Sequence, residues 1–223
     1  MIALAIDVST ARGAVALVGD DQPLGEETFD RSKPEMNLFD AARRLLAANG
    51  LQVNDLGLFA VGLGPGSFTG IRAGIAAAKG LALPHQLPMQ GVSSYDVIAA
   101  TALPDLPSDC EQICVLGDAR RGAIYFTIYN RDAQRTQEDR IGTLESLADE
   151  IHNPIWFVSS EIEKFQRDLV GLFGGFATVC NYSVFPSATV LGRQAARAFR
   201  NAGNRGDNNL EPIYLRKPEY RSL

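Results

Sequence analysis

The chain has 223 residues, 46% of them hydrophobic and 21% charged, with a formal net charge of −5, so it is long enough to bury one large core or two small ones. Its three cysteines include no CxxC pair and its two histidines lie far apart in sequence, which argues against a disulfide framework and against a metal centre. Because affinity for nucleic acid depends on neutralising phosphates, an acidic chain without a dense Lys/Arg stripe is not expected to bind RNA strongly by itself.

The N-terminal sequence, MIALAIDVST, has no basic leader, and its apolar run already ends at Asp7. This run is too short for a signal peptide, and no later stretch approaches the roughly 20 apolar residues that span a bilayer. The sequence therefore predicts a cytoplasmic protein with no membrane contact.

The first part of the chain predicts three strands followed by alternating helices and strands. Apolar runs near the N-terminus are separated by Asp, Ser, Thr and Gly, which are the residues of tight turns. Ser32 and Glu35 match a capping box with Pro34 between them, and apolar residues then recur at helical spacing. The elements predicted here are strands over 2–7, 13–18, 24–29 and 58–63 and helices over 35–49, 70–83 and 94–103.

The same order of elements then repeats. Ser160 and Glu163 match a second capping box, which predicts the start of a helix. The elements predicted in this part are strands over 113–117, 123–129, 155–158 and 177–180 and helices over 144–151, 160–173 and 187–200.

Two turns of similar sequence support an internal duplication. Asp7 is followed after four residues by Arg-Gly-Ala at the start of a strand, and Asp118 is followed after two residues by the same tripeptide in the same context. The sequence therefore predicts two related α/β halves, 1–104 and 105–186, with residues 187–223 able to pack back on the first half.

The most distinctive motif is GPGSFTG at residues 64–70, between a predicted strand and a predicted helix. Its backbone N–H groups and Arg72 in the first helical turn are suited to an anion. No GK[ST] follows, so a P-loop is excluded, and the acidic residue that a dinucleotide-binding loop needs about 20 positions later is missing. A structural turn or a protein contact is the favoured interpretation, with nucleotide binding as the weaker alternative. The candidate nucleotide-binding residues are Asp7, Ser9, Gly64, Gly66, Ser67, Thr69 and Arg72.

The turn after the first predicted strand is a second candidate site. A carboxylate such as Asp7 can organise Mg²⁺ through water, and the hydroxyl residues after it let a turn approach phosphate. The alternative, favoured for this turn in isolation, is a turn held by its own side chains. A phosphotransferase of this architecture clamps its nucleotide between two such turns, but the counterpart at Asp118 carries the bulky Arg120 and Arg121. This argues against independent kinase or ATPase activity, and no catalytic residue or metal ligand is predicted.

Two predicted helices carry faces suited to a protein partner. Small residues along the helix 70–83 let a second helix approach closely, and the apolar face of the helix 35–49 extends the same surface. The alternative is that both faces simply cover their own sheet, and the sequence does not decide between the two. The candidate partner-binding residues are Leu38, Phe39, Ala42, Leu45, Leu46, Gly70, Ala73, Gly74, Ala77, Ala78 and Leu81.

Five segments of the chain closely resemble bacterial TsaB proteins, in the same order over nearly the whole chain. They are LAIDVST (4–10), GPGSFTGIRAG (64–74), GVSSYDVIA (91–99), DARRGAIY (118–125) and EPIYLR (211–216). The resemblance implies an α/β actin-like ATPase (ASKHA) fold of two duplicated RNase-H-like halves. It also implies that the chain lacks the metal-binding histidines of the paralogue TsaD, which forms N6-threonylcarbamoyladenosine (t6A37) in tRNA.

The resemblance implies a function and partners as well. TsaB-like proteins pair with a TsaD-like catalytic subunit through helices of the first half, a TsaE-like ATPase joins that pair, and TsaB-like proteins form homodimers when alone. The chain is therefore expected to be a non-catalytic subunit that activates the TsaD-like enzyme and meets tRNA only through the complex. No cofactor of its own is expected, and ATP or ADP at the partner interface is left open. The alternative is an autonomous ASKHA-type kinase or ATPase, or a glycoprotease-like hydrolase.

The match to the family has two departures. Val8 stands where TsaB proteins usually have Thr, and a histidine that they often have near Lys33 is missing. A role of that histidine is therefore not carried over to this chain.

Overall fold

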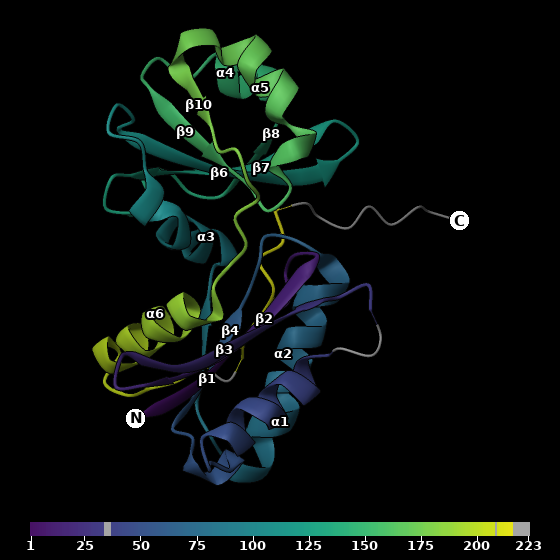
Figure 1. Ribbon diagram of the computed structural model, residues 1–223, viewed down its shortest axis with the longest axis vertical. Coiled ribbons are helices and arrows are strands. Elements are labelled where there is room, and N and C mark those ends of the chain that lie inside the picture. The colour runs from purple at the N-terminus through teal and green to yellow at the C-terminus, as the bar shows by residue number, and fades with distance from the viewer. Residues whose placement is uncertain (34–36, 208, 216–223) are drawn as a thin grey trace.

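The computed structural model describes residues 1–33, 37–207 and 209–215, which form two α/β halves, one above the other in Figure 1. The first half is built on a five-stranded sheet with the strand order β3-β2-β1-β4-β5. Its strands are β1 (Ile2–Asp7), β2 (Arg12–Gly19), β3 (Gln22–Asp30), β4 (Leu58–Gly62) and β5 (Met89–Val92). The sheet is mixed, because β1 pairs antiparallel with β2 and parallel with β4.

The second half repeats this sheet, with the strand order β10-β9-β6-β7-β8. Its strands are β6 (Gln112–Arg120), β7 (Ala123–Asn130), β8 (Arg140–Gly142), β9 (Ile155–Val158) and β10 (Ala177–Val179). Here β6 takes the place of β1, since it pairs antiparallel with β7 and parallel with β9. Both sheets thus have the same order and the same directions, and the predicted fold of two duplicated α/β halves is confirmed.

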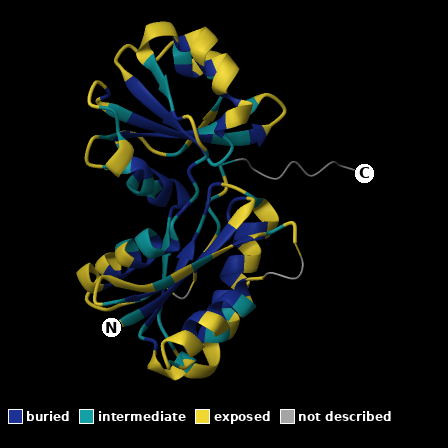
Figure 2. Cartoon of the chain, viewed as in Figure 1, coloured by how far each residue is buried: buried dark blue, intermediate teal, exposed yellow. Residues whose placement is uncertain are grey.

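Helices cover both faces of the first sheet (Figure 1). One face is covered by α1 (Leu38–Ala48) and α2 (Phe68–Ala82), and the other by α6 (Ala188–Asn201) from near the C-terminus. The helices and the sheet bury their apolar residues between them, and Figure 2 shows the resulting band of buried residues through the middle of each half.

The alternation of side chains along β1 explains this layering. Leu4 and Ile6 belong to the core under α1 and α2, whereas Ala3 and Ala5 face α6. Because the residues facing α6 are small, that helix lies close to the sheet. A Cβ atom placed on Gly192 of α6 would be 3.3 Å from the Cβ of Ala5.

Glu26 of β3 fixes the start of α6 on the first half. Its carboxylate accepts hydrogen bonds from Ser187 Oγ at 3.0 Å and from the backbone N–H groups of Ala188 and Thr189 at 2.9 and 3.2 Å. A carboxylate in this position satisfies N–H groups that have no partner within the helix, and it complements the helix dipole. Residues separated by about 160 positions are therefore joined by one side chain.

We expect Glu26→Ala to lower the free energy of unfolding by about 1–2 kcal/mol, because the first N–H groups of α6 lose their acceptor. Urea denaturation followed by circular dichroism measures this loss. The matched control is Glu27→Ala, which removes only the partner of Arg44 in a solvent-accessible ion pair and is expected to cost less than about 1 kcal/mol. Equal losses for the two variants would contradict the capping role of Glu26.

The second sheet also has helices on both faces. One face is covered by α4 (Leu144–Ala148) and α5 (Gln166–Phe173), and the other by α3 (Ser94–Ala102). Figure 1 shows α3 lying between the two halves. Its residue Ile98 packs with the core of the second sheet, and Val97 packs with α6 in the first half. One helix is therefore shared by both cores.

The C-terminal segment returns to the first half after α6. Leu210 is 4% exposed and belongs to the core under α1 and α2, and Ile213 N–H donates to the Leu63 carbonyl at 2.9 Å. Lys79 of α2 donates from Nζ to the Leu210 carbonyl at 3.2 Å. The segment therefore lies along one flank of α2.

The starts of two helices differ from the sequence-based prediction. The cap of α1 is Asn37, whose side chain accepts from two N–H groups of the first turn, whereas the Ser32 hydroxyl donates to Asp30. Glu35, the other member of the predicted capping box, lies outside the described residues. The second predicted capping box is wrong, because Ile162–Lys164 form a short 3-10 turn and α5 begins only at Gln166.

Two strands were missed by the sequence-based prediction, β5 and β8. The MQGV sequence of β5 has little strand propensity, and its pairing with β4 places it in the sheet. Among the helices of the described residues, none is both long and apolar enough to cross a membrane.

Candidate functional site

The turn after β1 is held together by the buried side chain of Asp7. The Asp7 residue is 1% exposed, and its Oδ1 accepts from Ser9 N–H at 2.8 Å and from Ser9 Oγ at 2.6 Å. Its Oδ2 accepts from the hydroxyl of Ser94, at the start of α3, at 2.7 Å. Burial raises the pKa of Asp7, and these hydrogen bonds act in the opposite direction. The favoured interpretation of this sequence, a turn held by its own side chains, agrees with this geometry.

The glycine-rich loop packs directly on this turn. Gly64 and Gly66 have φ angles of +87° and +155°, and the Gly64–Pro65 peptide bond is cis. A Cβ atom on Gly66 would lie 2.4 Å from the Ser9 carbonyl oxygen, which accepts Ser67 N–H at 2.7 Å. Ser67 in turn caps α2. Gly66 is therefore required for the close approach of the two backbones, and Gly64 for its left-handed φ angle.

A cleft of about 610 Å³ opens between the two halves at this point. Its first-half wall includes Ser9, Thr10, Arg31, Gly66, Ser67, Phe68 and Thr69, and its second-half wall includes Gly117, Asp118, Arg120, Tyr125, Glu161 and Lys164. Both walls therefore carry charged side chains.

The charges on the second-half wall are paired with one another. Asp118 lies 3.2 Å from Arg120 and 3.7 Å from Lys164, and Lys164 also pairs with Glu161. On the first-half wall, Arg31 donates from one terminal nitrogen to the Thr10 carbonyl at 2.8 Å. The second-half wall therefore carries a local ion-pair network.

The residues around the cleft do not fit a Mg²⁺-nucleotide clamped between the two turns. Both carboxylate oxygens of Asp7 accept hydrogen bonds within the fold, and burial keeps this carboxylate away from a hydrated cation in the cleft. Arg120 and Arg121 stand on the second turn with left-handed φ angles of +67° and +56°. Tyr95 lies against this turn, because a Cβ atom on Gly117 would be 2.5 Å from its hydroxyl oxygen.

The candidate nucleotide-binding residues are only partly brought together. Ser9, Gly66, Ser67 and Thr69 line the cleft, whereas Asp7 and Gly64 lie behind it in the loop contacts described above. Arg72 is directed to a different place, where its Nε–H donates to Tyr214 Oη at 2.5 Å. Nucleotide binding by these residues stays a prediction.

We expect Asp7→Asn to keep the free energy of unfolding at pH 7 within about 1 kcal/mol of the parent, because it removes a buried charge and keeps the acceptor for Ser9. The raised folded-state pKa means that the folded chain binds the Asp7 proton more tightly than the unfolded chain. The contribution of this group to stability therefore falls as pH rises above its ordinary pKa of 3.8. Urea denaturation of both proteins at a series of pH values should show this fall in the parent and not in the variant. A loss of several kcal/mol at pH 7 would contradict the expectation.

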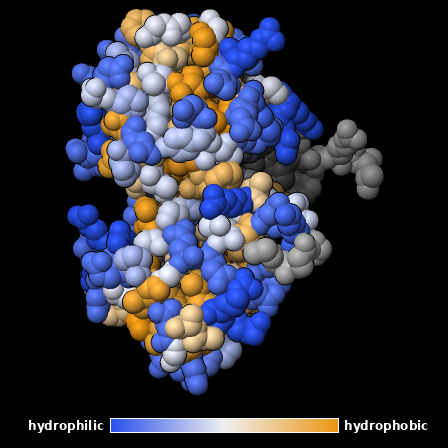
Figure 3. Space-filling model, viewed as in Figure 1, coloured by the Kyte–Doolittle hydropathy of each residue, from blue (hydrophilic) through white to orange (hydrophobic). Residues whose placement is uncertain are grey.

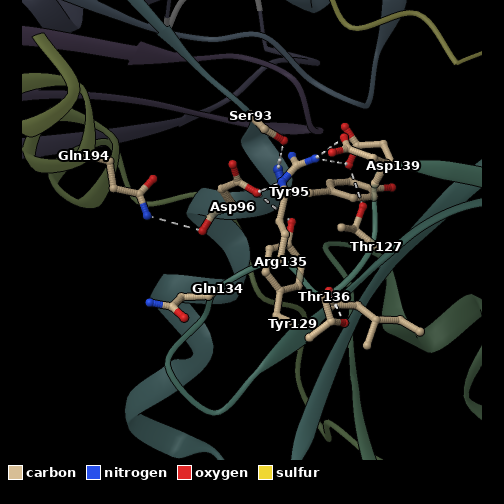
Figure 4. A network of polar contacts seen from close by, with 12 residues as sticks. Ser93, Tyr95, Asp96, Thr127, Tyr129, Gln134, Arg135, Thr136, Asp139 and Gln194 are labelled. Carbon is tan, nitrogen blue, oxygen red and sulfur yellow. Dashed lines mark hydrogen bonds and ion pairs between the residues drawn. The ribbon is translucent and has the colours of Figure 1, made fainter. Parts of the chain in front are cut away.

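A second polar cluster joins the halves through α3 (Figure 4). Asp96 Oδ1 accepts from Tyr129 Oη of β7 at 2.9 Å and from Arg135 Nε, in the loop after β7, at 2.5 Å. Arg135 also lies 3.2 Å from Asp139, which accepts from Thr127 Oγ1 at 2.5 Å. We call Asp96, Tyr129, Arg135, Asp139 and Thr127 the α3 cluster.

Most of the predicted partner-binding residues pack inside the first half. The buried ones are Leu38, Ala42, Leu45, Leu46, Gly70, Gly74, Ala77 and Ala78. A Cβ atom on Gly70 would lie 2.1 Å from the Val8 carbonyl oxygen, and one on Gly74 would lie 2.8 Å from Val8 Cγ2. Gly70 and Gly74 therefore let α2 approach the end of β1. The prediction that these residues form a surface strip is wrong, because the faces of α1 and α2 that carry them cover the first sheet.

The outer face of α2 carries a different strip of small residues. Its exposed members, which we call the α2 strip, are Thr69, Ala73, Ala76, Gly80 and Leu83. They are spaced by four, three, four and three residues, which places them on one side of the helix. A Cβ atom on Gly80 would meet nothing within 4 Å, so no contact within the chain requires a glycine there.

An apolar groove lies beside the α2 strip, between α1 and α2. Its volume is about 340 Å³, and its lining includes Phe39, Leu46, Leu51, Val53 and Leu81. Phe39, one of these lining residues, is 53% exposed. Figure 3 shows hydrophobic residues reaching the surface around α1 in the lower half. Of the predicted partner-binding residues, Phe39, Ala73 and Leu81 thus remain accessible.

Several residues of the cleft and of the α3 cluster were not singled out from the sequence. Arg31, Glu161 and Lys164 are isolated charges in sequence, and Asp96 meets Arg135 across 39 positions. No local spacing signals these contacts. Within the described ranges, no group of three or more His, Cys, Asp or Glu side chains is arranged to hold a metal ion, and Cys110, Cys114 and Cys180 are free and buried.

Comparison with solved structures first defines the class. YeaZ from Pseudomonas aeruginosa superimposes with a TM-score of 0.79 at 23% identity, over 96% of this chain and 99% of that one. The (R)-2-hydroxyglutaryl-CoA dehydratase component A of Acidaminococcus fermentans gives a TM-score of 0.52 at 9% identity, over 89% and 98%. The chain has the α/β actin-like ATPase fold.

Sequence comparison then gives the family. The family model "TsaD: tRNA N6-adenosine threonylcarbamoyltransferase" matches residues 35–202. The tRNA threonylcarbamoyladenosine biosynthesis protein TsaB of Bacillus subtilis is 27% identical over 98% of this chain and 96% of its own length. The protein of the same name from Escherichia coli is 35% identical, over 58% of this chain and 55% of its own length. The uncharacterized protein Rv3421c of Mycobacterium tuberculosis is 35% identical over 99% and 94%. The chain belongs to the TsaB family, within the group that the TsaD family model describes.

Proposed function

We propose that this chain is a non-catalytic subunit of the machinery that forms t6A in tRNA, and that it docks to a TsaD-like catalytic subunit and activates it. Membership of the TsaB family supports the pathway, because relatives carry the name tRNA threonylcarbamoyladenosine biosynthesis protein TsaB. The misfit between the cleft and a Mg²⁺-nucleotide supports a role without catalysis of its own.

The α2 strip is the observation that carries the docking proposal. Three of its members, Ala73, Ala76 and Gly80, have side chains no larger than a methyl group, so a helix of another protein can approach the α2 backbone closely along its length. The groove beside Phe39 extends this surface onto α1 and offers a place for an apolar side chain. Paired surfaces of this kind form four-helix interfaces.

The remaining partners follow from the same proposal. A TsaE-like ATPase joins the pair, and ATP or ADP binds, if at all, where the subunits meet. With a net charge of −5, the chain contacts tRNA through the complex rather than by itself. In the absence of the catalytic subunit, the α2 strip of a second copy covers the same surface and gives a homodimer.

The test is the affinity of the purified TsaD-like subunit for the parent chain and for Ala76→Arg, measured by calorimetry. A bulky charge in the middle of the α2 strip is expected to weaken binding by roughly a hundredfold or more, because it is buried against a close-packed helix. Ala198→Arg, on the exposed side of α6, is the matched control and should bind like the parent. The Ala77→Arg variant is unsuitable, because Ala77 is 7% exposed and the variant tests folding instead.

Normal binding of Ala76→Arg would contradict docking through the α2 strip. The alternative function, an autonomous kinase, ATPase or hydrolase, is tested by ATP turnover and peptide hydrolysis of the chain alone. Robust turnover without the catalytic subunit would overturn the proposal. Formation of t6A that requires both subunits would support it.

A further inference from the structure

We infer that Arg72 is the polar anchor of the docking surface and takes a carboxylate from the partner protein. The inference rests on the proposed function, which it deepens by naming the chemistry of the partner at one position. Three exposed side chains meet at the N-terminal end of α2. They are Phe68 and Arg72 of this helix and Tyr214 of the C-terminal segment. We call these three residues the Arg72 clamp.

The clamp holds the guanidinium group of Arg72 in one place. Its carbon lies 3.9 Å from the centre of the Phe68 ring and 5.4 Å from the centre of the Tyr214 ring. The two rings themselves are 5.5 Å apart with an interplanar angle of 32°. The Arg72 Nε–H donates to Tyr214 Oη at 2.5 Å. An exposed arginine normally samples many rotamers, but here stacking and a hydrogen bond hold it in advance of binding.

The C-terminal segment supports the clamp from behind. Tyr214 follows Ile213, whose backbone N–H is bonded to Leu63, and Leu210 is buried in the core of the first half. Lys79, two turns further along α2, is bonded to the Leu210 carbonyl. The segment is therefore attached along the flank of α2 before it reaches Tyr214. An anchor built from these residues is part of the folded chain and not a mobile tail.

The clamp leaves the recognition edge of the guanidinium unused. The contacts within the described residues engage Nε and the faces of the group, and its two terminal nitrogens form no hydrogen bond there. A planar group with free parallel N–H donors matches a carboxylate in a bidentate arrangement. Aromatic residues and arginine are also the residue types that dominate binding energy in protein interfaces. Phe68 is 52% and Tyr214 42% exposed, so both have area to bury.

The position of the clamp connects it to the α2 strip. Arg72 lies one turn before Ala76, on the same side of the helix, so a partner helix that packs on the strip passes the guanidinium. An Asp or Glu of that helix is the group that reaches it. A tRNA phosphate is the other anion with this chemistry, but the isolated clamp on an acidic chain lacks the several cations that RNA binding needs. The carboxylate is therefore favoured.

Binding of the purified TsaD-like subunit to clamp variants tests the inference. Arg72→Gln is expected to weaken binding by roughly tenfold or more, and Arg72→Lys by nearly as much, because lysine keeps the charge but loses the planar fork. Tyr214→Phe keeps the ring and loses the hydroxyl, so a smaller loss of a few fold is expected. Arg197→Gln, an exposed arginine on α6, is the matched control and should bind like the parent. Arg72 is exposed, and thermal melts should show all four variants to be folded as the parent is.

The outcomes separate this inference from the proposed function. If Ala76→Arg abolishes binding while Arg72→Gln and Arg72→Lys bind like the parent, docking stands and the anchor is wrong. If Arg72→Gln binds the catalytic subunit normally but the assembled complex retains tRNA less well, the anion is an RNA phosphate. If the parent chain itself does not bind the catalytic subunit, the proposed function fails together with the anchor. Weaker binding that loses part of its salt dependence in Arg72→Gln supports the carboxylate.

Discussion

Asp96→Ala should lower the free energy of unfolding by about 3 kcal/mol, although Asp96 lies in neither sheet. Its carboxylate is the shared acceptor of Tyr129 and Arg135, which belong to the other half of the chain. Removal of the acceptor leaves a hydroxyl on a residue with 0% exposure and a guanidinium whose side chain is 26% exposed. An unpaired donor at such a position costs more free energy of unfolding than the hydrogen bond itself contributes.

The ionisation of the α3 cluster points the same way. Burial raises the pKa of Tyr129, and the adjacent Asp96 charge adds to this effect. Burial lowers the pKa of Arg135, but the hydrogen bond to Asp96 and the charges of Asp96 and Asp139 together raise it by more. Loss of the Asp96 carboxylate leaves the half-buried Arg135 cation to Asp139, at 3.2 Å, and to the exposed Glu138, at 3.9 Å.

Urea denaturation of Asp96→Ala, Asp96→Asn and Glu150→Ala distinguishes the α3 cluster from an ordinary surface ion pair. Asp96→Asn keeps an acceptor for Tyr129 and should lose an intermediate amount of stability. Glu150→Ala removes the partner of Arg140 in a pair whose side chains are 43% and 36% exposed, so less than about 1 kcal/mol is expected. If Asp96→Ala costs no more than Glu150→Ala, the α3 cluster does not hold the halves together.

The second large effect is expected at Gly70, where alanine should lower the free energy of unfolding by about 3 kcal/mol or more. A Cβ atom there would lie 2.1 Å from the Val8 carbonyl oxygen and 2.7 Å from Cζ of Arg31. The carbonyl is part of the rigid turn after β1, so it cannot move aside without breaking the Asp7 contacts. Alanine is nevertheless the better helix former, and helix propensity alone predicts a gain.

Gly80→Ala is the matched control for this effect. Gly80 lies in the same helix, but a Cβ atom on it would meet nothing within 4 Å. The variant should gain about 0.5–1 kcal/mol from helix propensity. Opposite signs for the two substitutions in thermal or urea denaturation are expected. A gain for Gly70→Ala would mean that α2 does not approach the turn as closely as described.

The order of strands and helices within each half could be predicted because its signals are local in sequence. Apolar runs such as those of β1 and β2, separated by turn residues, specify strands over a few positions. The occurrence of Asp followed by Arg-Gly-Ala at two places predicts the duplication. The missed strand β5 shows the limit, since its MQGV sequence becomes a strand through pairing with β4.

The orientation of α2 could not be predicted from small residues alone. Gly70 and Gly74 face the sheet and Ala73 and Ala76 face outward, yet both sets are small. The signal that separates them is the large apolar neighbour Ile71, which is 2% exposed and marks the buried side. Polar or charged residues mark the other side. Hydrophobic pattern, and not size, decides which face of such a helix is free.

The contacts that join distant parts of the chain were beyond sequence reasoning. Asp7 meets Ser94 across 87 positions, and Glu26 meets Ala188 across 162. Serine and glutamate are common residues, and nothing in their neighbourhoods predicts these partners. The functional surface near Arg72 depends on such a contact, because Tyr214 lies 142 positions away.

The return of α6 and the C-terminal segment to the first half has a consequence for synthesis on the ribosome. The first sheet leaves the exit tunnel with one face bare, since Leu191, Ala195 and Phe199, which cover that face, are translated after every strand of the second sheet. The second half has all its strands within Gln112–Val179 and closes earlier. A chain released before Leu210 carries neither the Arg72 clamp nor the segment that supports it. On the docking surface proposed above, a product that ends before Tyr214 is therefore expected to lack the polar anchor for the catalytic subunit.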